Sequence, residues 1–77
     1  MNKPRRKELE KAMELIRQAM DIVGEVRDEE QEAYDNLPEG LQESERGETM
    51  GESIYDMDSV MEELDSQIET LEDIVSR

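Results

Sequence analysis

The residues best suited to chemistry in this chain lie in one polar stretch, residues 34–49. Directional hydrogen-bonding groups gather there around Gly40 and Gly47: Tyr34, Asn36, Ser44, Arg46 and Thr49. Arg46 is also the only cation within residues 28–76. Helix-start N–H groups, a guanidinium and a tyrosine ring can together grip an anionic or planar ligand. These five residues are therefore the candidate ligand-binding set.

The same side chains can also fill structural roles. Asn36 and Ser44 can cap helices, and Tyr34 can pack at the end of a helical bundle. Arg46 can neutralise neighbouring glutamates. The run from Asn36 to Glu39 resembles a capping box, which predicts a short helical turn there. The sequence leaves the structural and the ligand-binding interpretations open.

No set of residues comparable to this ligand-binding set is suited to catalysis. The chain has neither histidine nor cysteine, which excludes thiol chemistry, histidine acid-base catalysis and the usual zinc ligands. Paired carboxylates such as Asp56 and Asp58 lack the glycine and spacing of a calcium loop, and a di-iron bundle needs Glu-x-x-His motifs. We expect a protein that is not an enzyme, with no catalytic residue, no cofactor and no metal site.

Charge is the outstanding property of the composition. The 77 residues carry 23 acidic and nine basic side chains, for a net charge of −14. Residues 1–18 hold six basic and three acidic side chains, whereas residues 19–77 hold three basic and 20 acidic ones. Because phosphate binding requires a basic surface, we expect no free nucleic acid as a partner. No apolar run is long enough to span a bilayer, so we also expect no membrane.

Two long segments with heptad spacing flank the polar stretch. In the first, the apolar stripe is read as Leu9, Ala12, Ile16, Ala19, Val23, Val26, Ala33 and Leu37, with Glu30 as its one polar member. In the second it is Met50, Ile54, Met57, Met61, Leu64, Ile68, Leu71 and Val75. Such spacing keeps one seam of a helix facing a partner helix. We predict helices over residues 4–34 and 45–76, joined by a hinge over residues 35–44.

The predicted fold is all-α: a single-domain antiparallel two-helix hairpin, coiled-coil-like, assembled into a four-helix bundle or a higher oligomer. Antiparallel pairing brings the basic N-terminal cluster alongside the acids of residues 62–73. Further apolar side chains flank the seam and form the predicted oligomer interface: Met13, Leu15, Met20, Ile22, Val60 and Ile74. Two helices cannot cover so wide a face, so a homo-oligomer of at least two chains is expected.

The string NLPEGLQESERG in the hinge, with KPRRKELEKAMELI before it and an acidic heptad helix after it, resembles a group of small proteins encoded by phages and mobile elements of Firmicutes. The resemblance covers essentially the whole chain. It implies a small accessory protein of phage or mobile-element origin. The absence of cysteine and of a membrane span favours a location in the cytoplasm, which here would be that of the bacterial host. The resemblance assigns no activity to individual residues.

Two functions follow for such an accessory protein, both directed against a host defence. One is an oligomeric sponge that sequesters a nucleotide immune signal, a cyclic nucleotide or another small anionic ligand. The other is an acidic inhibitor or nucleic-acid mimic that binds a basic host protein. A simple assembly or scaffold bundle is a third alternative. The sponge is the preferred hypothesis because it uses the polar hinge, although the acidic surroundings repel phosphates.

Overall fold

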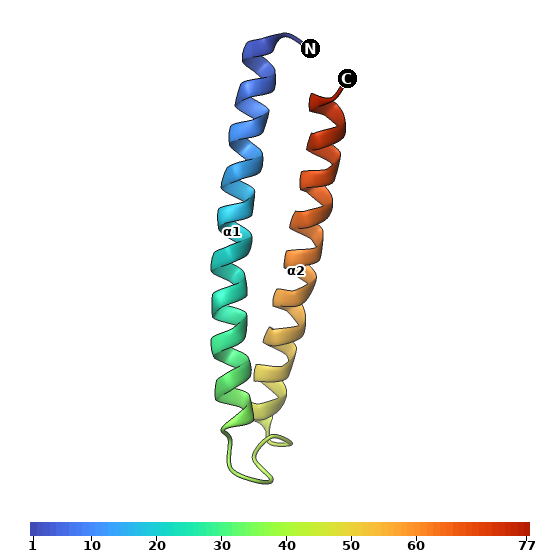
Figure 1. The fold of residues 1–77 in the computed structure, drawn as a ribbon. Helices are drawn as coiled ribbons and strands as arrows, with labels where there is room; N and C mark the ends of the chain where they lie inside the picture. The colour runs from blue at the N-terminus through green and yellow to red at the C-terminus, as the bar shows by residue number, and fades with distance from the viewer.

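All 77 residues are described in a computed structural model, in which two long helices run antiparallel and are joined by one loop (Figure 1). Helix α1 spans Lys3–Asp35 and helix α2 spans Glu45–Val75. No strand is present, so the all-α antiparallel hairpin predicted from the heptad spacing is confirmed. The single chain is a rod whose Cα atoms extend over 58 × 15 × 12 Å.

Polar side chains at both helix starts satisfy backbone N–H groups that have no partner inside the helix. Asn2 Oδ1 accepts a hydrogen bond from the Arg5 N–H at 3.0 Å. Ser44 Oγ accepts one from the Gly47 N–H at 3.3 Å. Ser44 is therefore the N-cap of α2, as the sequence predicts.

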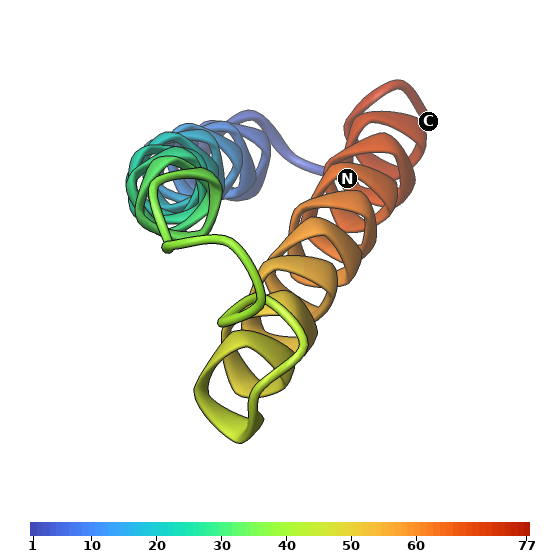
Figure 2. The same cartoon turned by 90° about the horizontal axis from the view of Figure 1, so that it is seen from below.

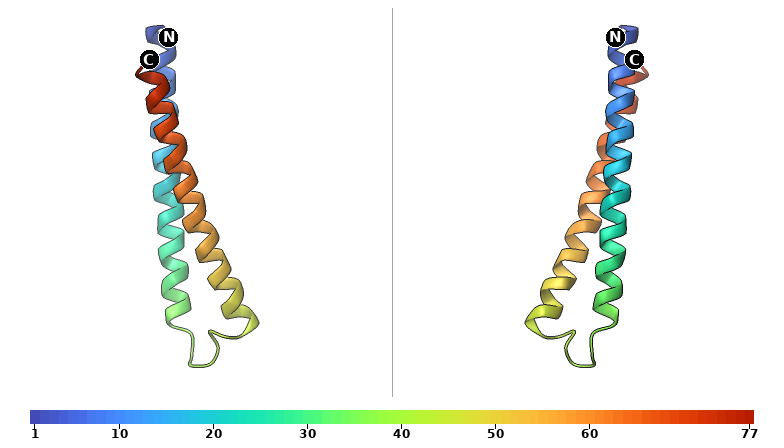
Figure 3. Two further views of the ribbon diagram at one scale, coloured as in Figure 1. Left: turned by 90° about the vertical axis from the view of Figure 1, so that its right-hand side faces the viewer. Right: turned by 90° about the vertical axis from the view of Figure 1, so that its left-hand side faces the viewer.

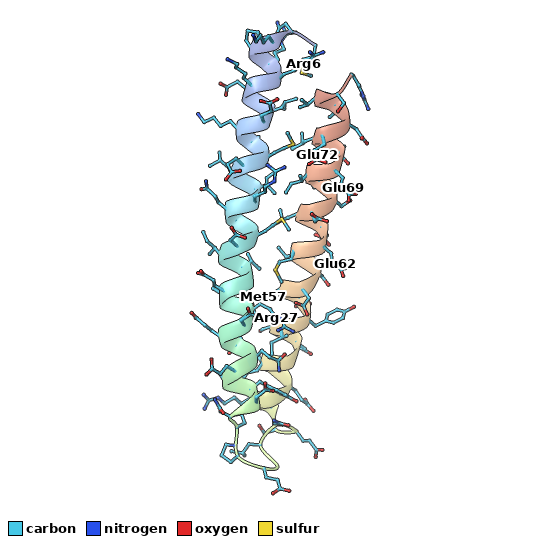
Figure 4. The ribbon with its side chains drawn as sticks, in the orientation of Figure 1. Arg6, Arg27, Met57, Glu62, Glu69 and Glu72 are labelled. Atoms are coloured by element: carbon cyan, nitrogen blue, oxygen red, sulfur yellow. The ribbon has the colours of Figure 1, made fainter.

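The stripe predicted for α2 forms the seam against α1. Each of its members is buried or half-buried: Met50, Ile54, Met57, Met61, Leu64, Ile68, Leu71 and Val75. Figure 4 shows Met57 directed into the space between the helices. An unbroken alternation of three and four residues thus gave the correct face of this helix.

The seam of α1 differs from the prediction. Its members at alternating intervals of three and four residues are buried or half-buried: Leu9, Met13, Ile16, Met20, Val23, Arg27, Glu30 and Tyr34. Ala19, Val26 and Ala33 were assigned to the seam but are exposed, whereas Ala12 is half-buried beside it. Two stripes overlap in this helix, one residue apart, and the longer methionine side chains reach across to α2 where alanine cannot. Met13, assigned to the oligomer interface, is instead a core residue with only 5% of its surface exposed.

The core of the hairpin is thin. Only four hydrophobic side chains are buried, Met13, Met50, Ile54 and Ile68, and none of them is completely excluded from solvent. The two helix axes are also inclined to one another. They approach each other toward the hinge in Figure 1, but diverge toward the hinge in the perpendicular views of Figure 3, and Figure 2 shows the inclination from below. A chain of this size with so little buried surface has a small margin of stability.

The hinge is a pair of tight turns rather than the predicted short helix. Asn36 is the C-cap of α1 and does not start a new helix, so the capping-box prediction is wrong. The Leu41 N–H donates to the Pro38 carbonyl at 3.0 Å, and the Ser44 N–H donates to the Leu41 carbonyl at 3.1 Å. Gly40 is the third residue of the first turn and has φ +88°, a conformation that side-chain-bearing residues rarely adopt and that prevents a helix from continuing.

Gly47 holds the hinge loop against the first turn of α2. A Cβ atom at this position would overlap the Gln42 carbonyl and come within 2.6 Å of the Leu41 oxygen, both backbone atoms. Gln42 in turn reaches back to α1, where its Nε2 donates to the Tyr34 carbonyl at 3.2 Å. The glycine thus lets the loop close directly onto both helices.

We predict that Gly47→Ala destabilises the protein by about 1–3 kcal/mol, because the added methyl group overlaps backbone that cannot move aside. Helix propensity alone gives the opposite sign, a gain of about 1 kcal/mol. Gly51→Ala is the matched control, since its Cβ would meet no atom within 4 Å. Thermal unfolding should show a lower Tm for Gly47→Ala and a higher Tm for Gly51→Ala. A rise in both variants would contradict the packing of the hinge.

Candidate binding surfaces

No side-chain hydrogen bond or ion pair joins any two of the five hinge residues of the candidate ligand site. Asn36 and Ser44 serve as helix caps, and the Ser44 hydroxyl also donates to the Leu41 carbonyl. Tyr34 is half-buried at the hinge end of α1. Arg46 and Thr49 are exposed in the first turns of α2, and no ion pair involves Arg46. The structural interpretation therefore accounts for Asn36 and Ser44.

A hollow of about 550 Å³ does exist at the hinge, but its lining does not suit an anion. It is formed by Leu37, Glu39, Gly40, Gln42 and Glu43. None of the five predicted ligand-binding residues lines it. Its two glutamates repel phosphate, so this hollow in a single chain is not a site for a nucleotide.

The predicted interface residues divide between two faces of the hairpin. Met13 lies in the core, and Met20 is half-buried in the α1 seam. Leu15 and Ile22 are exposed, to 57% and 62%, and Val60 is exposed to 41%. The sixth, Ile74, is half-buried. The last four form part of a surface outside the seam.

These outer apolar residues lie on one side of the hairpin. Each of them directly precedes a seam residue in the sequence. In α1, for example, Leu15 precedes Ile16, and in α2 Val60 precedes Met61. In an antiparallel helix pair, the residues that directly precede seam residues on the two helices face the same side of the pair. We call this side the apolar face: Ala12, Leu15, Ala19, Ile22, Val26, Val60 and Ile74.

The opposite edge of the hairpin is polar and holds the two ion pairs that join the helices. Arg17 pairs with Glu72 at 3.3 Å, and Arg27 Nε donates to Asp58 Oδ1 at 2.9 Å. That hydrogen bond raises the pKa of Arg27 above its ordinary value, so the guanidinium stays charged. Arg17, Glu72 and Asp58 each follow a seam residue, which places them on the other side from the apolar face.

Ion pairing between the helices is sparser than the charge pattern predicts. Among the basic residues of the N-terminal cluster, Arg17 alone pairs with the acids of α2. The others make no ion pair within the hairpin: Lys3, Arg5, Arg6, Lys7 and Lys11. Arg6 reaches only the Arg77 carbonyl, at 3.5 Å. Most of the basic cluster thus remains free of carboxylate partners.

A second exposed feature runs along the back of α2. Tyr55 is the most exposed of the large hydrophobic side chains, at 72%, and it lies in a row of carboxylates spaced at helical intervals. We call this row the acidic ridge: Glu48, Glu52, Tyr55, Glu62 and Glu69. Its four glutamates are exposed and make no ion pair, and Figure 4 shows Glu62 and Glu69 on the side of α2 turned away from α1.

Tyr55 was not among the residues predicted to bind, although its position in the heptad pattern carries a signal. The residue directly follows the seam position Ile54, and its heptad equivalents are Glu48, Glu62 and Glu69. An aromatic residue at a position that is otherwise glutamate has no place in the seam. Exposed tyrosine is enriched at protein interfaces because it supplies a large, rigid contact surface with a polar end.

The remaining features carry no chemistry. The acidic side chains nowhere form a group of three that could hold a metal ion. Neither helix is both long and apolar enough to cross a bilayer. A shallow hollow of about 380 Å³ at the N-terminal end of the apolar face is lined by Met1, Pro4, Arg5, Glu8 and Leu9.

The chain was compared with known protein families, with curated proteins and with solved structures, and none of the three comparisons gave a match. The candidate surfaces are therefore interpreted from their own residues.

Proposed function

We propose that this protein is a non-enzymatic binding protein whose acidic ridge engages a basic surface on a partner protein. The observation that carries the proposal is Tyr55, 72% exposed among four unpaired glutamates on a rigid helix. A helix holds these groups in fixed register, so little entropy is lost when a partner orders them. The target class is a protein with an arginine- or lysine-rich groove, of the kind that binds nucleic-acid phosphates.

The physical basis of recognition combines two contributions. Rows of carboxylates attract a basic surface from a distance and speed association, in a salt-dependent way. The Tyr55 ring can then lie against an arginine or lysine, a contact that is favourable by about 0.5–2 kcal/mol. In this proposal the ridge imitates the charge of a nucleic acid, and the ring adds an anchor. The anti-defence role hypothesised for such an accessory protein fits here with a basic host protein as target.

We predict that Tyr55→Ala weakens binding to the basic partner by about tenfold or more, the cost of removing an aromatic hot spot. The probe is an arginine-rich peptide labelled with a fluorophore, followed by nucleic-acid-binding proteins of the host, with fluorescence anisotropy as the readout. Duplex DNA should compete with the hairpin for the same protein. Unchanged affinity of Tyr55→Ala for every partner that wild type binds would exclude the ridge as the binding surface.

A matched pair of charge variants separates the ridge from net charge. The ridge variant changes four carboxylates of α2 to amides: Glu48→Gln, Glu52→Gln, Glu62→Gln and Glu69→Gln. The control removes four carboxylates from exposed positions of α1 outside the apolar face: Glu10→Gln, Asp21→Asn, Glu25→Gln and Glu32→Gln. Both variants have the same net charge. We expect loss of binding in the ridge variant alone; equal losses would mean that attraction is non-specific.

Sequestration of a nucleotide by an assembly of several chains is a second candidate, and Arg46 is the observation that favours it. This cation is exposed and unpaired in the first turn of α2, where the helix dipole disfavours positive charge. A bound phosphate would give it a partner. The basic N-terminal cluster of another copy would have to offset the nearby glutamates.

We predict for this second candidate that a cyclic dinucleotide at about 100 times its Kd adds roughly 2.7 kcal/mol to stability. Arg46→Ala should abolish the thermal shift, because it removes the only cation at the hinge. Glu43→Gln is the control and should enlarge the shift, since it removes repulsion. Absence of any shift with wild type across a panel of cyclic di- and trinucleotides would leave the acidic ridge as the sole proposal.

A further inference from the structure

The apolar face is a feature of the hairpin that neither the ion-paired edge nor the acidic ridge explains. Three of its members, Leu15, Ile22 and Val26, are exposed to 57%, 62% and 48% along one side of α1. Val60 adds a further apolar side chain from α2, exposed to 41%. Contiguous apolar surface on a highly charged protein marks an interaction site.

We propose that a second copy of this chain covers the apolar face, with the two hairpins antiparallel and α1 packed on α1. The apolar residues of α1 are arranged nearly symmetrically about Ala19. A two-fold axis that passes beside the helix there brings Ala12 level with Val26 of the other copy, and Leu15 within one residue of the level of Ile22. The small Ala19 side chain at the centre allows the two helices to approach closely. A surface that matches itself in this way is what a two-fold dimer requires.

The charges of α1 are complementary under the same two-fold axis. Under this axis, residues 3–11 of one copy lie opposite residues 27–35 of the other. The first range holds five basic and two acidic side chains, and the second holds one basic and five acidic ones. None of the five basic side chains has a carboxylate partner within its own hairpin. A second antiparallel copy supplies those partners.

The opposite arrangement, with the two hairpins parallel, is disfavoured by repulsion. Residues 19–60, which form the hinge half of the rod, carry 14 acidic and two basic side chains. The remaining residues carry nine acidic and seven basic ones. Parallel stacking would place the two strongly acidic halves side by side, whereas antiparallel stacking places each one beside a nearly balanced half. Like charges in contact select against the wrong orientation.

The dimensions of the hairpin suit such an interface. The Cα atoms of one hairpin extend over 58 Å along the rod and 15 Å across it, whereas a standard protein interface buries about 800 Å² per partner. The hollow beside Pro4 and Arg5 lies at one end of this face. Under the two-fold axis it falls opposite residues 29–37 of the other copy, so the footprint extends along most of α1.

This dimer does not depend on the proposed function, because the acidic ridge lies on the back of α2. Single substitutions therefore separate the two. We expect wild type to elute at the mass of two 9.0 kDa chains in size-exclusion chromatography with light scattering. Ile22→Glu should raise the dimer dissociation constant by a hundredfold or more, since it places a charge at the centre of an apolar contact. Tyr55→Glu is the matched control, because Tyr55 is at least as exposed as Ile22 but lies on the ridge, and this variant should remain a dimer.

Spin labels test the orientation without any change to the apolar face, and they keep the proposal falsifiable if Ile22→Glu fails to fold. The chain contains no cysteine, so Lys7→Cys gives one label per copy. Lys7 lies 12 residues from Ala19, and at 1.5 Å per residue the two labels should be about 36 Å apart in the antiparallel dimer. Gln18→Cys, near the axis, should give a distance below about 20 Å. A single-chain mass for wild type, or short distances from both labels, would overturn the proposal.

Discussion

Burial of two heptad stripes against each other is the interaction on which the rest of this structure depends. With only two helices, that seam is one side chain deep, and just four hydrophobic residues are buried. Hydrogen bonds within the helices do not compensate for this, because most helical stability in proteins comes from packing of the apolar side. Every other surface of the rod is therefore available for charged residues or for contact with a partner. Because the seam is so thin, the hairpin would also be stabilised by binding a partner.

The hairpin has three distinct outward surfaces, and each follows from position relative to the seam. On the polar edge, Arg17 and Glu72 form an ion pair between residues that each follow a seam position, and Arg27 of the seam pairs with Asp58. Residues that precede seam positions form the apolar face, which we assign to a second copy. The back of α2 carries Tyr55 and the unpaired glutamates, which we assign to a basic partner. One helix can thus take part in folding and partner binding at once, because its sides face in different directions.

The sequence predicted the hairpin and the seam of α2 because one apolar stripe there has no rival. In α1 two stripes compete, Ala12 and Ala19 against Met13 and Met20, and periodicity alone cannot rank them. Side-chain reach decided in favour of methionine, and the half-buried Arg27 joined the seam because Asp58 supplies a hydrogen-bonded partner. The hinge prediction failed for a different reason: Gly40 adopts a positive φ, which composition permits but does not require. Tyr55 was not predicted because the heptad pattern identifies buried positions, and this residue lies outside them.

Small-angle X-ray scattering of the purified protein tests most directly whether a second copy of the chain covers the apolar face of the hairpin. Side-by-side antiparallel hairpins double the mass without lengthening the particle, so the account predicts two 9.0 kDa chains in a particle whose longest dimension stays near the 58 Å of one hairpin. A particle with the mass of one chain, or a dimer close to twice that length, would contradict it.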